Sequence, residues 1–327
     1  MKCLRTVLSG LLALTAGPAL CAFAAEAQNQ YPAHPIRMVV GFAAGGATDL
    51  FARIVAQRLT ERWGQQVVVD NRTGAGGSLG TAIVAKAQPD GYTLAVISSS
   101  HMINASLYKS LPFDPIADFD GVAMICGITN VLAVHPSLPA KSVPEFIALA
   151  KAKPGAINFA SGGVGSSSHL GGELFKSMAG IQIVHVPYKG TADALRDLIS
   201  GQVQSTVDAV SALLPHINKG ALRALGVGDM KRMPQLPDVP TIAEAGLPGF
   251  EYVAIVGVLA PARTPREVVA KLNREINEIL NTPEIGARFA EMGAHPSLMT
   301  PQQINALVKN DVAKFARIIK SAGVQMQ

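Results

Sequence analysis

A glycine-rich loop that joins an apolar run directly to an amphipathic helix is the feature that most constrains the fold of this chain. The loop, Gly41-Phe42-Ala43-Ala44-Gly45-Gly46-Ala47-Thr48-Asp49, follows the expected strand 36–40. Beyond it, apolar residues recur every four positions from Phe51 to Trp63, and Gly64 marks the expected end of the helix. Glycines let the backbone approach a ligand closely, and the first helical turn offers unpaired N–H groups. The junction therefore predicts an anion-binding loop.

Short apolar runs alternate with helical patterns along the chain, which indicates an α/β fold. The expected strands are 36–40, 67–70, 93–97, 122–126, 131–134, 157–160, 181–186, 203–207, 222–227 and 253–259. Capping boxes mark four expected helix starts, at Ser142-x-x-Glu145, Thr241-x-x-Glu244, Thr264-Pro265-x-Glu267 and Thr300-Pro301-x-Gln303. A chain of 327 residues exceeds one ordinary core and suggests two domains.

The first residues have the pattern of a secretory signal. Lys2 and Arg5 precede an uncharged apolar stretch, and Ala22-Phe23-Ala24 fits an A-x-A cleavage site. We expect residues 1–27 to be a signal peptide and the mature chain to lie outside the cytoplasm; a membrane anchor is the alternative, but the apolar core is short. The other cations form no basic stripe, which argues against nucleic-acid binding. Two of the three cysteines belong to the signal, so Cys126 is expected to be a buried free thiol.

Four loops and one strand end carry the candidate ligand-binding residues, because open α/β sheets bind ligands beyond the carboxyl ends of their strands. Their amides and hydroxyls are suited to hydrogen bonding a carboxylate. The candidates are Phe42, Gly45, Gly46, Ala47, Thr48 and Asp49 in the first loop, Ser98, Ser99 and Ser100 in the second, Ser161, Gly165, Ser166, Ser167 and His169 in the third, Tyr188 in the fourth, and Asp208 after the run 203–207.

Most candidates also have a purely structural interpretation. Thr48 or Asp49 is a suitable N-cap, and three consecutive serines from Ser98 are typical of a solvated turn. His169 is suited to capping a helix or positioning its loop. Asp208 either caps the next helix or accepts a hydrogen bond from an ammonium or hydroxyl group of a ligand.

Several familiar catalytic and cofactor motifs are absent from the sequence. The segment Gly74-Ala75-Gly76-Gly77-Ser78-Leu79-Gly80 approaches a dinucleotide fingerprint, but Leu79 occupies the third glycine position. There is no Walker A sequence and no metal-ligand spacing of histidines or cysteines. The same segment contains the pattern G-x-S-x-G at residues 76–80, but it does not directly follow an expected strand, as the nucleophile elbow of a hydrolase would. We therefore expect no cofactor and no metal, and an enzyme is not the leading interpretation.

Seven short motifs are distributed in order over the mature chain. They are Tyr31-Pro32…Pro35-Ile36-Arg37, Gly45-Gly46-Ala47-Thr48-Asp49, Asn71-Arg72-x-Gly74-Ala75-Gly76-Gly77, Pro89-Asp90-Gly91-Tyr92-Thr93-Leu94, Ser168-His169-Leu170, Val186-Pro187-Tyr188-Lys189-Gly190 and Pro237-Asp238-Val239-Pro240-Thr241. Through these motifs, which follow family order, the chain resembles the Bug, or TctC-like, extracytoplasmic solute receptors of tripartite tricarboxylate transporters.

The resemblance implies a periplasmic-binding-protein fold of the type II-like class, with two α/β lobes that close on a ligand. Lobe 1 would comprise 28–130 and 252–327, and lobe 2 would comprise 131–251, with crossings near Asn130-Val131 and Glu251-Tyr252. It also implies a monomer in the periplasm that binds a small carboxylate without an arginine clamp and delivers it to membrane-embedded transporter subunits.

Two departures from the family pattern bear on the pocket. This chain has Ala43 where the family often has proline, and the strand of the second crossing has Ile255 near the usual tryptophan position. We therefore hypothesise an altered or more apolar pocket. Two other functions stay open: a periplasmic sensor that reports to a signalling protein, and an extracytoplasmic hydrolase that uses Ser166 to Ser168 with His169. The sequence does not name the ligand.

Overall fold

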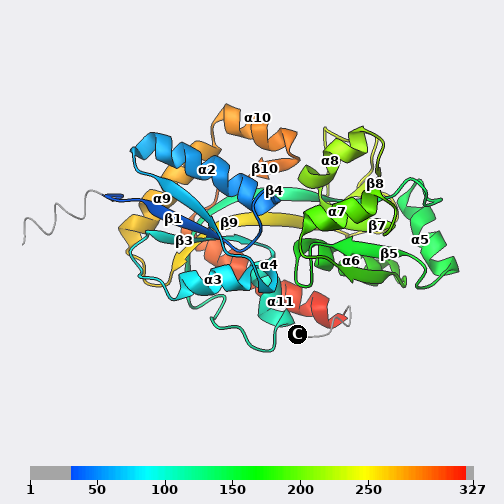
Figure 1. The fold of residues 1–327 in the computed structure, drawn as a ribbon, viewed down its shortest axis with the longest axis horizontal. Coiled ribbons are helices and arrows are strands. Elements are labelled where there is room, and N and C mark those ends of the chain that lie inside the picture. Colours follow the sequence, from blue (N-terminus) through cyan, green and yellow to red (C-terminus); the bar gives the residue numbers. More distant parts are fainter. Residues whose placement is uncertain (1–30, 322–327) are drawn as a thin grey trace, which may run out of the picture.

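A mixed sheet runs through the whole molecule and joins two α/β halves that lie side by side (Figure 1). The computed structural model describes residues 31–321, so the expected signal peptide, 1–27, lies outside the described residues. The strand order is β2-β1-β3-β9-β4-β7-β5-β6, with β10 and β8 also paired to β4. The α/β fold class with two lobes is confirmed.

The first half contains the N-terminal strands and the C-terminal helices. Three parallel strands, β2, β1 and β3, adjoin β9, which is antiparallel to β3. Its strands are β1 (Ile36–Val40), β2 (Val67–Asn71), β3 (Thr93–Ser98), β9 (Val253–Pro261) and β10 (Ala294–Pro296). Its helices are α2 (Ala47–Trp63), η1 (Ala75–Gly77), α3 (Ser78–Ala85), α4 (Ser100–Leu107), α9 (Arg266–Leu280), α10 (Pro283–Glu291) and α11 (Pro301–Ser321).

The second half is formed by the middle of the chain. Its parallel strands β6, β5 and β7 are followed by an antiparallel pairing of β7 with β4. The elements are α5 (Val143–Ala152), β5 (Asn158–Ser161), α6 (Ser167–Ala179), β6 (Val184–Pro187), α7 (Thr191–Ile199), β7 (Ser205–Ala209), α8 (Val210–Asn218) and β8 (Arg223–Val227).

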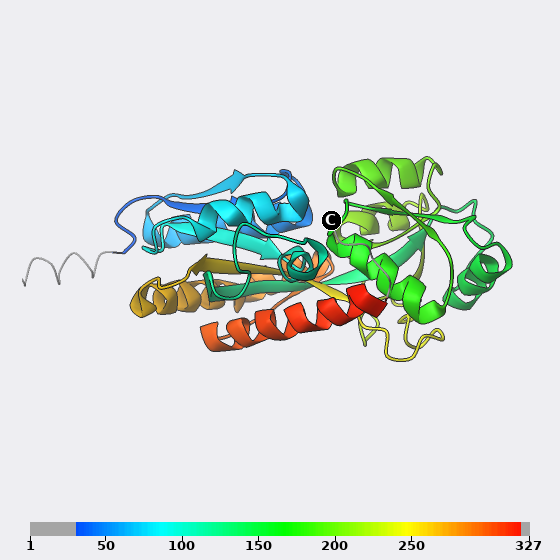
Figure 2. The same ribbon diagram turned by 90° about the horizontal axis from the view of Figure 1, so that it is seen from below.

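One long strand, β4 (Phe119–Val134), connects the two halves. It pairs with β9 as far as Thr129 and with β7 from Asn130 onward. The two separate strands expected at 122–126 and 131–134 are therefore wrong, because the intervening residues continue the pairing instead of turning. The lobe boundaries given above remain a proposal. Figure 2 shows α11 running beneath the first half toward the second. Along its length, α11 contacts α4 of the first half and α6 of the second.

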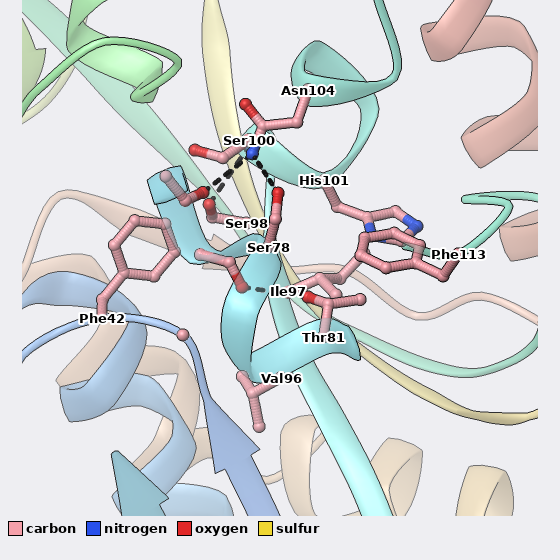
Figure 3. A pocket seen from close by; sticks show the side chains of 13 residues that line it. Phe42, Ser78, Thr81, Val96, Ile97, Ser98, Ser100, His101, Asn104 and Phe113 are labelled. Atoms are coloured by element: carbon pink, nitrogen blue, oxygen red, sulfur yellow. Dashed lines mark hydrogen bonds between the residues drawn. The ribbon is translucent and has the colours of Figure 1, made fainter. Parts of the chain in front are cut away.

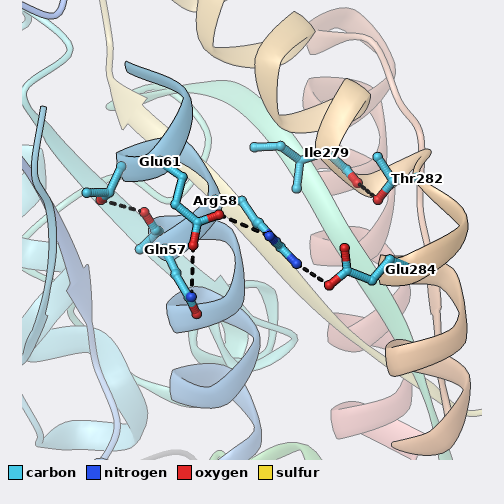
Figure 4. A network of polar contacts seen from close by, with 8 residues as sticks. Gln57, Arg58, Glu61, Ile279, Thr282 and Glu284 are labelled. Atoms are coloured by element: carbon cyan, nitrogen blue, oxygen red, sulfur yellow. Dashed lines mark hydrogen bonds and ion pairs between the residues drawn. The ribbon is translucent and has the colours of Figure 1, made fainter. Parts of the chain in front are cut away.

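The predicted apolar stripe of α2 packs into the core of the first half. Phe51 is fully buried and meets Phe289 of α10 edge to face, with ring centroids 4.8 Å apart. Outside this contact, Arg58 pairs with both Glu61 and Glu284, which links α2 to α10 (Figure 4). Exposed ion pairs contribute little free energy, so the aromatic contact stabilises the packing of α2 on α10 more than the ion pair does. Among residues 31–321, no helix combines the length and apolar character that a membrane span requires.

The predicted capping boxes have mixed outcomes. Ser142 accepts a hydrogen bond from the amide three residues later at the start of α5, and Thr300 does the same before α11, as expected. Thr241 also forms its box, but only turns follow, so the helix expected there is wrong. Thr264 bonds back to the Pro261 carbonyl and does not cap α9, which begins at Arg266.

Candidate functional site

The first glycine loop ends at α2, whose first turn has no side-chain cap. Gly46 occupies the N-cap position with extended backbone angles, φ −73° and ψ 163°, and provides no side-chain cap. The N–H groups of Ala47 and Thr48 therefore have no acceptor within the helix. Gly45 precedes them with φ 82°, a left-handed conformation that favours glycine. These amides and the positive end of the helix dipole are suited to a carboxylate.

The Asp49 side chain stabilises this loop through hydrogen bonds. Its side chain is 1% exposed, and its carboxylate accepts hydrogen bonds from the Gly45 amide, Arg53 Nε and Asn71 Nδ2, each at 2.9 Å. Burial raises the pKa of Asp49, but these hydrogen bonds outweigh burial and hold the pKa below its usual range. Because the carboxylate is already bonded within the loop, the donors left for a ligand are backbone amides.

The serine loop between β3 and α4 borders a cavity of about 10 Å³ in the first half, and Phe42 lines the same cavity (Figure 3). Ser98 Oγ accepts from the Ser100 amide at 3.3 Å, and Ser99 Oγ accepts from the Ile255 amide of β9 at 3.1 Å. Ser100 Oγ is buried without a hydrogen-bond partner in the described part of the chain. Since an unpaired buried hydroxyl costs free energy, Ser100 is the serine of this loop best placed to bond a ligand.

The third loop connects β5 to α6 and is held by its own side chains. Ser161 Oγ lies 2.6 Å from His185 Nε2 of β6. Ser166 Oγ caps α6 by accepting a hydrogen bond from the His169 amide at 3.2 Å. Ser167 takes the first helical position, so its own N–H has no acceptor within α6. This loop therefore repeats the first one: a strand, small residues and a helix start that presents an amide.

His169 stacks against His185 and supports the third loop. Their ring centroids lie 4.1 Å apart with planes inclined by 20°, and His169 Nδ1 accepts a hydrogen bond from the Gly165 amide at 3.3 Å. Burial lowers the pKa of His169 to about 4 and that of His185 to about 3. Both imidazoles are therefore neutral near pH 7. Within residues 31–321, the His169 ring makes no hydrogen bond to a serine hydroxyl, which a Ser–His nucleophile would need.

Asp208 lies at the end of β7, close to the starts of α6 and α7. The hydroxyls of Ser168 and Thr191 and the amide of Ala209 donate to its carboxylate, the amide at 2.7 Å. Burial dominates and raises the pKa of Asp208 to about 6, although these hydrogen bonds act in the opposite direction. Hydroxyl dipoles surround this carboxylate, and it joins two helix starts of the second half.

Tyr188 is the candidate whose side chain points elsewhere. Its hydroxyl donates to Asp197 of α7 at 2.7 Å, and burial together with this bond raises its pKa to about 12. The third loop, in contrast, meets helix α4 of the first half. A Cβ added to Gly165 would lie 2.5 Å from Asn104 Oδ1 of α4. Tyr252, at the return crossing, donates its hydroxyl to the Ser167 carbonyl at 2.9 Å.

Several residues that shape the site were not among the candidate ligand-binding residues of the sequence analysis: Asn104, Ser168, His185, Thr191 and Tyr252. Ser168 and Thr191 stand beside candidate loops and carry hydroxyls, so their proximity to a predicted strand end was an available signal. Asn104 follows Ser100 by one helical turn and therefore shares its helix face. His185 and Tyr252 have no local signal, because their roles arise from contacts with distant segments.

Comparisons with known proteins show the family to which the chain belongs. Residues 51–324 match the model of the tripartite tricarboxylate transporter family receptor, TctC. The chain belongs to this family. It is 38% identical to protein BugT of Bordetella pertussis over 320 residues, which cover 97% of each chain.

Two solved structures are similar to this TctC-type receptor. Rpa4515 of R. palustris, solved with adipate, gives a TM-score of 0.86 at 39% identity and covers 90% of this chain and 98% of its own. MatC (Rpa3494) from Rhodopseudomonas palustris, with bound malate, gives 0.82 at 32% identity and covers 88% and 100%. The expected resemblance to the Bug and TctC-like receptors is confirmed, as is the expectation of a solute-binding protein instead of an enzyme.

Proposed function

We propose that this receptor captures a small carboxylate between its two halves in the periplasm and presents it to a membrane transporter. The observation that carries the proposal is the start of α2, where Gly46 gives no side-chain cap and leaves the Ala47 and Thr48 amides free. Fixed peptide dipoles bind an anion with less desolvation cost than a buried ion pair. The residues that line the neighbouring cavity include no lysine or arginine.

The start of α6 supplies the opposing contact in this proposal. Ser166 already caps that helix, so the Ser167 amide and the Ser100 hydroxyl are the further donors that we assign to the ligand. The other sequence candidates act through the backbone or hold the loops: Phe42, Gly45, Gly46, Asp49, Ser98, Ser99, Ser161, Gly165, Ser166, His169, Tyr188 and Asp208. Contacts that close the two halves would favour the ligand-bound state.

The family and its structures support the ligand class and the destination. Receptors of this family are periplasmic, and the two similar structures hold adipate and malate. Both molecules are dicarboxylates, so we propose a small dicarboxylate as the first ligand to test. Delivery to a tripartite transporter and a monomeric state follow from the family pattern, and they remain parts of the proposal.

A thermal-shift experiment on the mature chain tests the ligand class. The protein is unfolded and refolded to remove carried-over ligand, and its melting is measured with adipate, with malate and with the dimethyl ester of each. A ligand at a hundredfold excess over its Kd adds about 2.7 kcal/mol of stability. We expect at least one acid to raise the melting temperature and its ester to leave it unchanged. An ester that stabilises as well as its acid would overturn the proposed anion site.

A further inference from the structure

Asn104 of α4 lies where the two halves meet, and it fixes the turn Ala75–Gly77 of the first half. Its side chain is buried, and Nδ2 donates to the Gly76 carbonyl at 3.0 Å and to Ser78 Oγ at 2.9 Å (Figure 3). The turn needs such support, because Ala75 has φ 47° and Gly76 has φ 60°, and alanine rarely adopts this left-handed conformation. The hydrogen bonds of the Asn104 carboxamide therefore stabilise a turn whose backbone is strained.

The other side of Asn104 faces the second half. A Cβ added to Gly165 would lie 2.5 Å from Asn104 Oδ1 and 2.9 Å from Leu107 Cδ2. Close by, a Cβ added to Gly76 would lie 3.4 Å from the Val164 carbonyl oxygen. The backbone of the third loop thus packs directly on α4 and on the turn, and an added methyl group at Gly165 would force the side chains of Asn104 and Leu107 to move.

Asn104 Oδ1 is buried and accepts no hydrogen bond from any residue in 31–321. If the halves separated, water would reach this oxygen, whereas the contact with Gly165 shields it. An unpaired buried carbonyl costs free energy, so this contact opposes closure when nothing else favours it. Ligand contacts would have to supply the compensating free energy.

We propose that Asn104 and Gly165 form the closure contact of this receptor, and that Asn104 is the positioning residue that limits how tightly the halves close on a ligand. This inference deepens the proposed carboxylate-binding function and rests on it. Asn104 itself need not touch the ligand. Its carboxamide holds the turn Ala75–Gly77 of the first half and contacts the loop at Gly165 of the second half. The position of that turn and that loop therefore sets how closely the two halves approach.

The test is the variant Gly165→Ala, with Gly155→Ala as its matched control. Gly165 has φ 79° and Gly155 has φ 75°, but a Cβ at Gly155 would meet nothing within 4 Å. Both variants carry the same backbone strain, and only Gly165→Ala blocks the contact. Calorimetric titration with adipate and with malate should show affinity at least about tenfold weaker for Gly165→Ala than for the control. In an Asn104→Ala background, the added methyl group should cost much less.

A cross-linking experiment examines the contact without any ligand. The substitutions Ala75→Cys and Val164→Cys would place one thiol on each side of the contact, and the native Cys126 is fully buried. Because maleimide coupling is irreversible, a short bismaleimide should trap transient closure and join the introduced pair in the ligand-free mature chain and in the Gly155→Ala background. The yield should fall severalfold in the Gly165→Ala background.

The two readouts separate the possible failures. Equal cross-linking in the Gly165→Ala and Gly155→Ala backgrounds would overturn the closure contact, whatever the ligand. Equal affinities for the two variants would overturn it as well. If the unmodified chain binds neither acid, the proposed dicarboxylate function fails, and the cross-linking yields still decide whether Asn104 and Gly165 limit closure.

Discussion

Replacing Ala47 with proline removes one proposed ligand donor and leaves α2 intact. Ala47 is the first residue of α2, where proline is well tolerated because its missing N–H has no partner in the helix. The preceding residue must be extended, and Gly46 already has φ −73° and ψ 163°. Pro283 occupies the first position of α10 in the same way, so the protein accepts this geometry elsewhere.

The expected effect on binding is large compared with the effect on stability. A hydrogen bond to a charged group contributes about 1.5–3 kcal/mol, so losing the Ala47 amide should weaken carboxylate binding roughly 10- to 150-fold. Proline at a compatible position should leave the free energy of unfolding unchanged or raise it by about 0.4–1 kcal/mol. Isothermal titration with adipate and malate measures the first quantity, and urea denaturation of ligand-free protein measures the second.

Ala47→Ser is the matched control, because it changes the side chain but keeps the amide. The serine variant should bind with nearly the affinity of the unmodified chain. If Ala47→Pro binds the acid as tightly as Ala47→Ser does, the start of α2 does not hold the carboxylate, and the central argument for the site is wrong. If the proline variant loses stability as well, proline is not compatible with the first position of α2, and the weaker binding reflects a disturbed helix instead of a lost ligand donor.

Three further results are expected. Asp49→Asn should destabilise the chain by about 1–3 kcal/mol in urea denaturation, because the NH2 group of asparagine cannot accept the hydrogen bonds that the carboxylate accepts from Gly45 and Arg53. As a control, Asp193→Asn, which changes an exposed ion pair, should alter stability little. Ser166→Ala should cost about 1 kcal/mol through the lost cap of α6, and Ser166→Asp should restore it. Because the pKa of His169 falls to about 4 on folding, protonation of this one ring should contribute roughly 2 kcal/mol to the stability lost between pH 7 and pH 5. In urea denaturation at the two pH values, a His169→Gln variant should lose less stability than the unmodified chain by about that amount.

The local patterns predicted most of the fold because each was complete within a short window. The stripe from Phe51 to Trp63 and the stop at Gly64 lie in one segment, and the structure places α2 and its C-cap there. The same local patterns did not predict that β4 is one continuous strand. Both of its faces are buried, so neither a period of two nor a turn residue marks where it passes from one half to the other.

The candidate site shows the same limit more sharply. Glycines and serines after strands correctly indicated helix starts with free amides, because those depend on local backbone geometry. The partner of each side chain could not be read in this way. Asp49 looked like a ligand contact and is bonded to Asn71, while Ser161 is bonded to His185, and both partners come from distant segments. Tertiary contacts, which a single sequence does not encode locally, decide which polar groups remain free.

The two halves differ in how their polar groups are used, and this difference bears on binding. In the second half, Ser166 and Asp208 already make hydrogen bonds within the protein, and the Tyr252 hydroxyl donates to the Ser167 carbonyl, so the helix starts are fixed before any ligand arrives. In the first half, Ser100 Oγ and Asn104 Oδ1 are buried and have no hydrogen-bond partner among residues 31–321. A preformed surface avoids the entropy cost of ordering side chains on binding. Unpaired groups do the opposite and raise the free energy of the closed, empty state, so closure depends on what the ligand contributes.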